Sequence, residues 1–177
     1  MTRSRTRRGM RRGRTAAAVA TVIGTAAALV ACGSDAPAEL VDVRWQITRI
    51  EDAPAEESGT AVANGLSQTD QTRSWIALGG NTSFTGAIGC MALSGSIEWM
   101  EDEKVHFEDL KARDASEEDG TDCMPNDEAL ADRLIEVLDD AELTWSTPSD
   151  EEMRLTRKDD KVADWQTKRF VEFIATY

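Results

Sequence analysis

Short segments in which apolar and polar residues alternate recur along most of this sequence. Alternation places every second side chain on one face, as in a half-buried β-strand. Turn signals follow at close spacing, and Gly79-Gly80-Asn81 is typical of a hairpin. The segments expected as strands lie at Val41–Ile47, Trp75–Leu78, Thr82–Gly89, Leu93–Trp99, Val105–Phe107, Leu143–Ser146, Met153–Thr156 and Trp165–Ala175. We therefore expect a mainly β (α+β) fold, a small antiparallel β-barrel or rolled sheet.

One helix is predicted, from about Asp127 to Ala141. Pro125 and Asn126 supply its start signal, and two acids follow in the first turn, where the helix dipole favours them. The apolar positions that form its single stripe are Leu130, Leu134, Val137, Leu138 and Ala141. Residues 51–72 and 114–122 are polar and are expected to form long exposed loops.

The first 31 residues differ in composition from the rest of the chain. They contain seven arginines and no acid, and a run of mostly Ala, Val and Thr extends from Thr15 to Ala31. A basic start, an apolar middle and small residues at the end are typical of a secretory signal. A transmembrane helix is the less favoured alternative, because it needs about 20 strongly apolar residues. We therefore expect an exported protein.

The end of this signal resembles the bacterial lipobox, in the residues Leu29-Val30-Ala31-Cys32. The resemblance implies cleavage before Cys32 and a diacylglyceryl group on its thiol, whose two acyl chains anchor the protein stably to the cell membrane. The alternative is an ordinary signal peptide that ends near a cysteine. Either the Sec or the Tat route is compatible with the paired arginines. The expected organisation is a signal peptide at 1–31, a lipidated N-terminus with a short tether at 32–40, and one domain at 41–177.

Removal of the signal makes the chain strongly acidic. The full sequence has 20 basic and 33 acidic residues, and loss of the seven arginines leaves 13 basic residues and a net charge of −20. Such a surface repels nucleic acid and anionic lipid headgroups. We therefore expect no nucleic-acid partner, and attachment to the extracytoplasmic face of the membrane through the lipid on Cys32.

Cysteine usage agrees with export. With Cys32 lipidated, Cys90 and Cys123 form an even pair in an oxidising compartment, and a disulfide between them closes a loop of about 33 residues. The alternatives are two reduced thiols or part of a metal site. A metal site needs more ligands than these two cysteines, and the single His106 does not complete one. We expect the disulfide, with no metal and no cofactor.

The order of these elements resembles the META/HslJ-like domain, a family of small bacterial envelope and lipoprotein domains. The residues that carry the resemblance are Val43-Arg44-Trp45 in the opening strand, the segment Phe84–Gly95 with its Gly89-Cys90, and Gly120-Thr121-Asp122-Cys123 before the helix. The match spans roughly Val41 to Thr176. It implies a barrel-like fold, an envelope or stress-related role and no established catalytic activity. The family has an asparagine after the first cysteine, where this chain has Met91.

Patterns of catalytic chemistry are absent from the sequence. His106 is expected on the outer face of a strand, and no Gly-x-Ser-x-Gly elbow, phosphate-binding loop or dinucleotide fingerprint is present. The acids between Asp114 and Asp122 lack the spacing of an EF-hand, so a solvated acidic loop is favoured over a calcium site. We expect a protein that is not an enzyme.

Five tryptophans occupy five separate strand segments, and the favoured interpretation is core filling. The alternative is an aromatic-lined barrel that binds a small apolar or glycan ligand, with Trp45, Trp75 and Trp99 as candidate ligand-binding residues. The leading functional hypothesis is a non-enzymatic envelope lipoprotein that is stress-related or binds a cell-surface component, including an envelope protein. A carrier or sensor with a Trp-lined interior and a secreted inhibitor of hydrolases are the alternatives.

Overall fold

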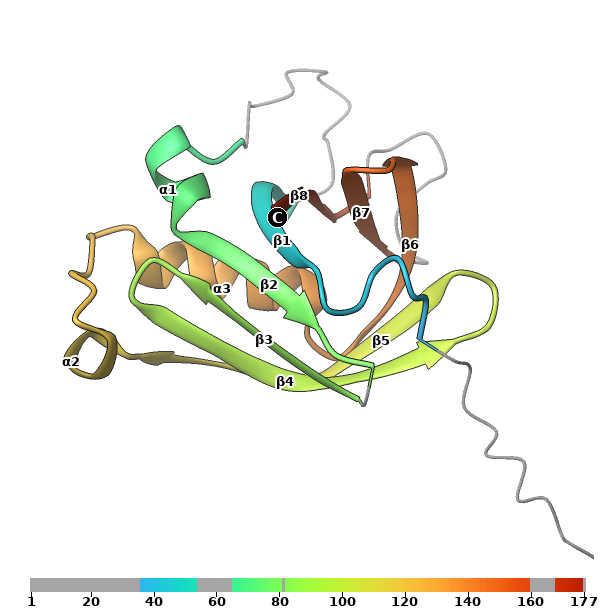
Figure 1. Cartoon of the computed structure of the whole chain (residues 1–177), viewed down its shortest axis with the longest axis horizontal. Coiled ribbons are helices and arrows are strands. Elements are labelled where there is room, and N and C mark those ends of the chain that lie inside the picture. The colour runs from blue at the N-terminus through green and yellow to red at the C-terminus, as the bar shows by residue number, and fades with distance from the viewer. Residues whose placement is uncertain (1–35, 54–64, 81, 160–167, 177) are drawn as a thin grey trace, which may run out of the picture. The chain divides into compact units, whose positions relative to one another are not determined.

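Eight antiparallel strands close into a barrel in which each strand pairs with its neighbours along the chain and the last pairs with the first (Figure 1). The computed structural model describes residues 36–53, 65–80, 82–159 and 168–176. The strands are β1 (Arg44–Glu51), β2 (Ser74–Leu78), β3 (Ser83–Ile88), β4 (Met91–Met100), β5 (Lys104–Asp114), β6 (Ala141–Ser149), β7 (Glu152–Arg157) and β8 (Phe170–Thr176). The helices are α1 (Gln68–Thr72), α2 (Ser116–Asp119) and α3 (Asp127–Leu138). The expected mainly β fold is confirmed, and the barrel is closed.

Two short helices, α1 and α2, lie in segments that were expected to be loops. The Ser67 side chain caps α1 by accepting a hydrogen bond from the Asp70 N–H, and α2 ends at Gly120 in the left-handed conformation. Helices of four or five residues are too short to show an apolar stripe, so periodicity does not reveal them.

The long helix, α3, ends at Leu138, three residues before its expected end at Ala141. Asp139 has an extended backbone and Asp140 a φ of +47°, and together they turn the chain into β6. Ala141 is nevertheless buried, now as the first residue of β6. Its burial therefore fits the apolar stripe even though its backbone is not helical.

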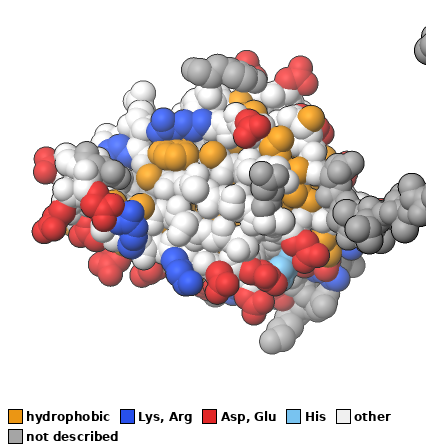
Figure 2. Space-filling model, turned by 60° about the horizontal axis from the view of Figure 1, so that its bottom comes forward, with side chains coloured by type: hydrophobic (Ala, Val, Ile, Leu, Met, Phe, Trp, Pro, Cys, Tyr) orange, Lys and Arg blue, Asp and Glu red, His pale blue; other side chains and the backbone are white. Residues whose placement is uncertain are grey.

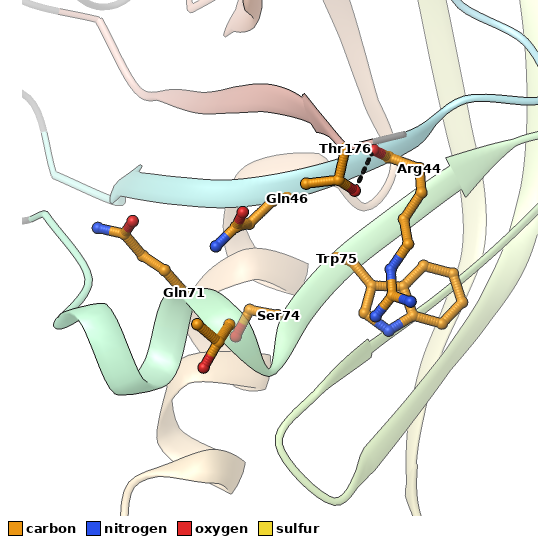
Figure 3. Close-up of a pocket in the computed structure, with 7 residues that line it drawn as sticks. Arg44, Gln46, Gln71, Ser74, Trp75 and Thr176 are labelled. Atoms are coloured by element: carbon orange, nitrogen blue, oxygen red, sulfur yellow. Dashed lines mark hydrogen bonds between the residues drawn. The ribbon is translucent and has the colours of Figure 1, made fainter.

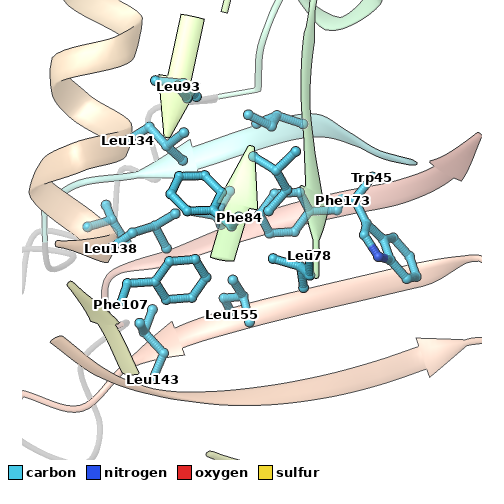
Figure 4. Close-up of a cluster of buried hydrophobic side chains, with 14 of the residues drawn as sticks. Trp45, Leu78, Phe84, Leu93, Phe107, Leu134, Leu138, Leu143, Leu155 and Phe173 are labelled. Carbon is cyan, nitrogen blue, oxygen red and sulfur yellow. The ribbon is translucent and has the colours of Figure 1, made fainter. Parts of the chain in front are cut away.

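Large side chains fill the inside of the barrel (Figure 4). The rings of Phe84 and Phe107 meet edge to face with their centroids 5.5 Å apart, and Trp45 is 2% exposed. The apolar stripe of α3 packs against strands on both sides of the barrel and covers one of its ends. Leu40, placed in the tether by the sequence analysis, is fully buried in the same core and its carbonyl accepts a hydrogen bond from the Trp45 indole. The interior is therefore a packed core.

The pairing of β1 with β2 is short. It covers three positions, from Arg44 opposite Ala77 to Gln46 opposite Trp75. Beyond Gln46 the edge of β1 is taken by residues 65 and 66, since the Leu66 N–H donates to the Thr48 carbonyl (2.9 Å). The two strands therefore separate at the start of β2, and α1 lies at the point of separation.

A buried carboxylate, Asp127, joins the start of α3 to the turn between β3 and β4. It is 2% exposed and accepts hydrogen bonds from the backbone N–H groups of Cys90 (3.1 Å) and Met124 (2.9 Å). It also forms an ion pair with Arg73 in which both guanidinium N–H₂ groups donate to its two oxygens (3.2 and 3.0 Å). At Gly89, with φ +57°, an added Cβ would lie 2.0 Å from this carboxylate, so only glycine fits there.

This ion pair positions the start of β2, because Arg73 directly precedes Ser74 and Trp75. The Arg73 guanidinium also donates to the Asp122 carbonyl (2.6 Å), next to Cys123. The α1–β2 junction, the β3–β4 turn and the segment before α3 are thus held at one point. We call the group of Arg73, Gly89, Cys90 and Asp127 the Asp127 junction.

Replacement of Asp127 should destabilise the protein strongly. Asp127→Ala leaves the Arg73 guanidinium and two backbone N–H groups without their acceptor, and loss of one partner of a buried pair lowers the free energy of unfolding by about 3–5 kcal/mol. The matched control is Glu118→Ala, which removes an exposed pair with Arg113 (2.8 Å) and should change stability by less than about 1 kcal/mol. Urea denaturation of both variants measures the difference. Equal losses in the two variants would contradict a special role for the Asp127 junction.

Candidate functional site: a groove on the outer face of the barrel

A groove of about 420 Å³ lies on the outside of the barrel, where β1 and β2 separate beside α1 (Figure 3). This volume falls in the range of small-molecule sites, about 300–1,000 Å³. The residues that line the groove are Arg44, Gln46, Gln71, Thr72, Ser74, Trp75 and Thr176. They come from β1, α1, β2 and β8, so the groove is built by segments that are far apart in the sequence.

Arg44 and Trp75 form the best-defined contact in the groove. Because Gln46 is directly opposite Trp75, Arg44 is the diagonal neighbour of Trp75 across the β1–β2 pair. The guanidinium carbon of Arg44 lies over the indole, 4.4 Å from the ring centroid (Figure 3). On the other side of β1, the Thr176 hydroxyl donates to the Arg44 carbonyl (2.9 Å). The position of Arg44 is therefore determined from both neighbouring strands.

The Arg44 guanidinium makes no ion pair and no hydrogen bond with the described part of the chain. Each of the other described arginines has an acid or a carbonyl as partner: Arg49, Arg73, Arg113, Arg133, Arg154, Arg157 and Arg169. None of the described residues that line the groove is an aspartate or glutamate, although the chain has 33 acids. The groove is therefore a locally cationic site on an acidic protein.

Ser74 carries a buried polar group next to the same groove. It is 1% exposed, and its hydroxyl has no hydrogen-bond partner within the described residues. An unpaired buried hydroxyl costs about 1–3 kcal/mol, so such groups are rare in folded proteins and call for an explanation. Ser74 is the first residue of β2, at the point where the pairing with β1 has ended. Ser74 is on the same face of β2 as Ile76 and Leu78, so its hydroxyl points into the barrel and is closed off from the groove.

The structure does not bring the three predicted ligand-binding tryptophans together. Trp45 is in the core, and Trp99 is 8% exposed with its indole N–H directed at the Gly79 carbonyl (3.5 Å). Trp75 lies on the outer face, since its neighbours Ile76 and Leu78 point inward. Two of the three tryptophans therefore fill the core, and only Trp75 lines the groove. Trp145 is half-buried and packs against the core from β6, and Trp165 lies outside the described residues.

Sequence reasoning missed most of the groove. Arg44, Gln46 and Ser74 were not singled out, because their meeting depends on the register between β1 and β2. The available signal was the position of Trp75, which occupies an outward-facing place in the strand segment Trp75–Leu78. A large aromatic residue at an outward position, opposite a strand that carries an arginine, indicates a surface contact.

Cys90 and Cys123 are joined in a disulfide with their Cα atoms 5.0 Å apart, as the sequence predicts. The Asp114 carboxylate lies 3.6 Å from the Cys123 sulfur. Hydrogen bonds from the Ser116 side chain and backbone N–H lower the pKa of the Asp114 carboxyl from its ordinary value of 3.8. The disulfide is next to the Asp127 junction, because Cys90 belongs to both.

The only trio of cysteine, histidine or acidic side chains that could ligate a metal, among the described residues, is Cys90, Asp114 and Cys123. Its two sulfur atoms are bonded to each other, so this trio is not a set of free ligands. His106 faces outward from β5 and lies 3.4 Å from the Glu108 carboxylate. In Figure 2, acidic side chains gather along the edge of the face in view, as expected for a solvated acidic surface.

The remaining sequence predictions concern the membrane. Cys32 and the signal segment lie outside the described residues. In the part of the chain that the structure describes, no helix combines the length and the apolar character needed to cross a bilayer.

Comparison with known proteins gives little further information. No protein-family model and no curated protein matches the sequence. Among solved structures, a DUF4847 family protein from Bacteroides vulgatus is similar, at 11% sequence identity and a TM-score of 0.48, over 76% of this chain and 93% of that chain.

Replacement of Ser74 should not destabilise the unliganded protein, whereas removal of a hydrogen-bonded hydroxyl should. Ser74→Ala removes an unpaired buried polar group, so the free energy of unfolding should stay the same or rise by up to about 1 kcal/mol. The control is Thr48→Val, because the Thr48 hydroxyl donates to the Glu172 carbonyl (3.1 Å) and its loss should cost about 1 kcal/mol. Chemical denaturation of both variants tests this, and a clear loss in Ser74→Ala would show that its hydroxyl is already paired within the protein.

Proposed function

We propose that this chain is an extracytoplasmic lipoprotein that is held to the membrane through Cys32 and binds a component of the cell envelope without chemical turnover. The observation that carries the binding role is the groove, in which the Arg44 guanidinium lies over the Trp75 indole beside uncharged polar side chains. The N–H groups of this guanidinium are available to a ligand, because they have no hydrogen-bond or ion-pair partner among the described residues.

Two features support binding at the outer face over a carrier that uses the barrel interior. The interior is occupied by the core side chains, with Trp45 and Trp99 among them. Within the described part of the chain, the groove lining has amides, hydroxyls, one guanidinium and one indole, and no carboxylate, imidazole or thiol. Carboxylates, imidazoles and thiols are the usual acids, bases and nucleophiles of enzymes. The composition of the groove therefore favours recognition over catalysis.

The membrane attachment and the META/HslJ-like membership are supported by the residues that suggested them. The lipobox-like Leu29-Val30-Ala31-Cys32 supports lipidation. The Asp127 carboxylate accepts a hydrogen bond from the Cys90 N–H in the turn before Met91, so this turn is held without an asparagine at position 91. An envelope or stress-related role is part of the same proposal.

Lipidation predicts the location of the protein in cells. In a bacterial host, the wild-type chain should sediment with membranes and incorporate labelled palmitate, because two acyl chains anchor a protein stably. Cys32→Ala should abolish both signals. Cys32→Ser, which retains the size of the thiol, should abolish them as well. Membrane association and label that persist in both variants would contradict anchoring at Cys32.

The groove should be needed for binding to the cell envelope. Purified full-length protein should co-sediment with isolated cell-wall material, and Trp75→Ala should reduce the bound fraction several-fold, because loss of the indole also releases Arg44. Trp145→Ala is the control, as it removes a half-buried tryptophan of β6 that packs against the core and does not line the groove. Equal binding by wild type and Trp75→Ala would exclude the groove as the binding site.

A further inference from the structure

We infer that the groove binds a saccharide that carries a carboxylate, with the carboxylate on Arg44 and sugar hydroxyls on Gln46 and Thr72. The inference rests on the proposed binding function and names the class of ligand. It is carried by three observations: the unpaired guanidinium stacked on an indole, the uncharged polar side chains beside it, and the closed edges of the barrel.

The charge of the groove indicates an anionic group on the ligand. Arg44 is the described arginine whose guanidinium has no acid or carbonyl partner, in a chain with 33 acids and 20 basic residues. Such a protein has acids available to pair with an arginine, yet none of those that the structure describes lines the groove. A bound carboxylate supplies the missing counter-charge, and the planar guanidinium can bind it through two parallel hydrogen bonds.

Stacking on Trp75 holds the Arg44 guanidinium in an orientation suited to binding a carboxylate. The guanidinium carbon lies over the indole at 4.4 Å, and the backbone carbonyl of Arg44 is held by the Thr176 hydroxyl. A stacked guanidinium keeps the N–H groups at its edge available for hydrogen bonds, and its orientation is already restricted before the ligand arrives. Little conformational entropy is then lost on binding.

The other lining groups match a sugar ring. A pyranose has C–H groups on its faces and hydroxyls around its rim, and each hydroxyl both donates and accepts hydrogen bonds. The groove has the same combination, with apolar surface on Trp75 and hydroxyl or amide groups on Gln46 and Thr72. The Gln71 side chain also lines it, with its N–H₂ group donating to the Leu66 carbonyl (2.8 Å).

A peptide is the less suitable occupant. Extended peptides commonly bind by adding a strand to a free sheet edge. Each of the eight strands here pairs with two neighbours, and beyond Gln46 the edge of β1 is occupied by residues 65 and 66. The groove therefore offers side chains and no open backbone ladder, which favours a ligand recognised through its hydroxyl and carboxylate groups.

The test compares two ligands that differ only in charge. A glucuronate-terminated disaccharide and its carboxyl-reduced form, which carries a CH₂OH group instead, are titrated calorimetrically into the purified full-length protein. The acidic sugar should bind roughly tenfold or more tightly, as a charge-assisted hydrogen-bonded pair implies. Added salt should weaken the binding of the acidic sugar and leave the binding of the reduced sugar unchanged.

Variants of Arg44 assign the preference to this residue. Arg44→Gln should make the two sugars bind equally, and Arg44→Lys should retain part of the preference, because the charge stays and the two-pronged geometry is lost. Arg113→Gln removes the same charge from a distant exposed site and should keep the full preference. Unchanged thermal unfolding in the Arg44 variants shows that the fold is intact.

The outcomes separate the ligand class from the proposed function. Equal binding of the two sugars, or a preference that survives Arg44→Gln, overturns the acidic saccharide and leaves groove-dependent envelope binding in place. Tighter binding of a short peptide with a free C-terminal carboxylate also overturns the acidic saccharide and leaves groove-dependent envelope binding in place. Failure of the wild-type protein to retain any cell-wall material, with no difference on Trp75→Ala, overturns the proposed function itself.

Discussion

The ion pair between Arg73 and Asp127 is the interaction on which the arrangement of this protein depends. Asp127 accepts hydrogen bonds from two backbone N–H groups and from the Arg73 guanidinium. Its carboxylate lies so close to Gly89 that only glycine fits at that position. Charged groups are seldom buried unless they are paired and hydrogen-bonded in this way. The pair brings together segments that are 54 residues apart, and the disulfide from Cys90 to Cys123 crosses the same region. Because Ser74 and Trp75 follow Arg73, the same interaction determines where one wall of the groove lies.

Closure of the barrel explains why the proposed binding site is on its outside. All eight strands are paired, and the aromatic and aliphatic side chains of the inward-facing positions leave the interior packed. The outer face is interrupted where β1 and β2 separate after three paired positions, and residues 65 and 66 and α1 enter at that point. In a continuous sheet, side chains stand at regular intervals. Where two strands separate, side chains beside the gap can face one hollow. Gln46 and Thr72 come to line one hollow for this reason.

The sequence was sufficient for the fold and insufficient for most of the groove. Alternation of apolar residues is local, so the segments around Trp45, Phe84 and Leu93 predict strands from their own residues alone. The cysteine pair could be predicted from the number of cysteines and the expected compartment. The contact of Arg44 with Trp75 depends on the register between strands about 30 residues apart, and the missing partner of Ser74 is a property of the folded surroundings. Asp127 appears in the sequence only as an acid in the first turn of a helix.

The pairing of the first strand with the last has a consequence for the reach of the groove. Arg44 at the start of β1 lies beside Thr176 at the end of β8, so the groove is next to the point where the chain enters the barrel. Twelve residues separate Cys32 from Arg44, and even a fully extended chain of that length spans no more than about 43 Å. With the proposed lipid on Cys32, the groove samples a thin layer above the bilayer. Encounters in such a layer occur at a high effective concentration, so a weak intrinsic affinity is enough to keep an envelope ligand bound.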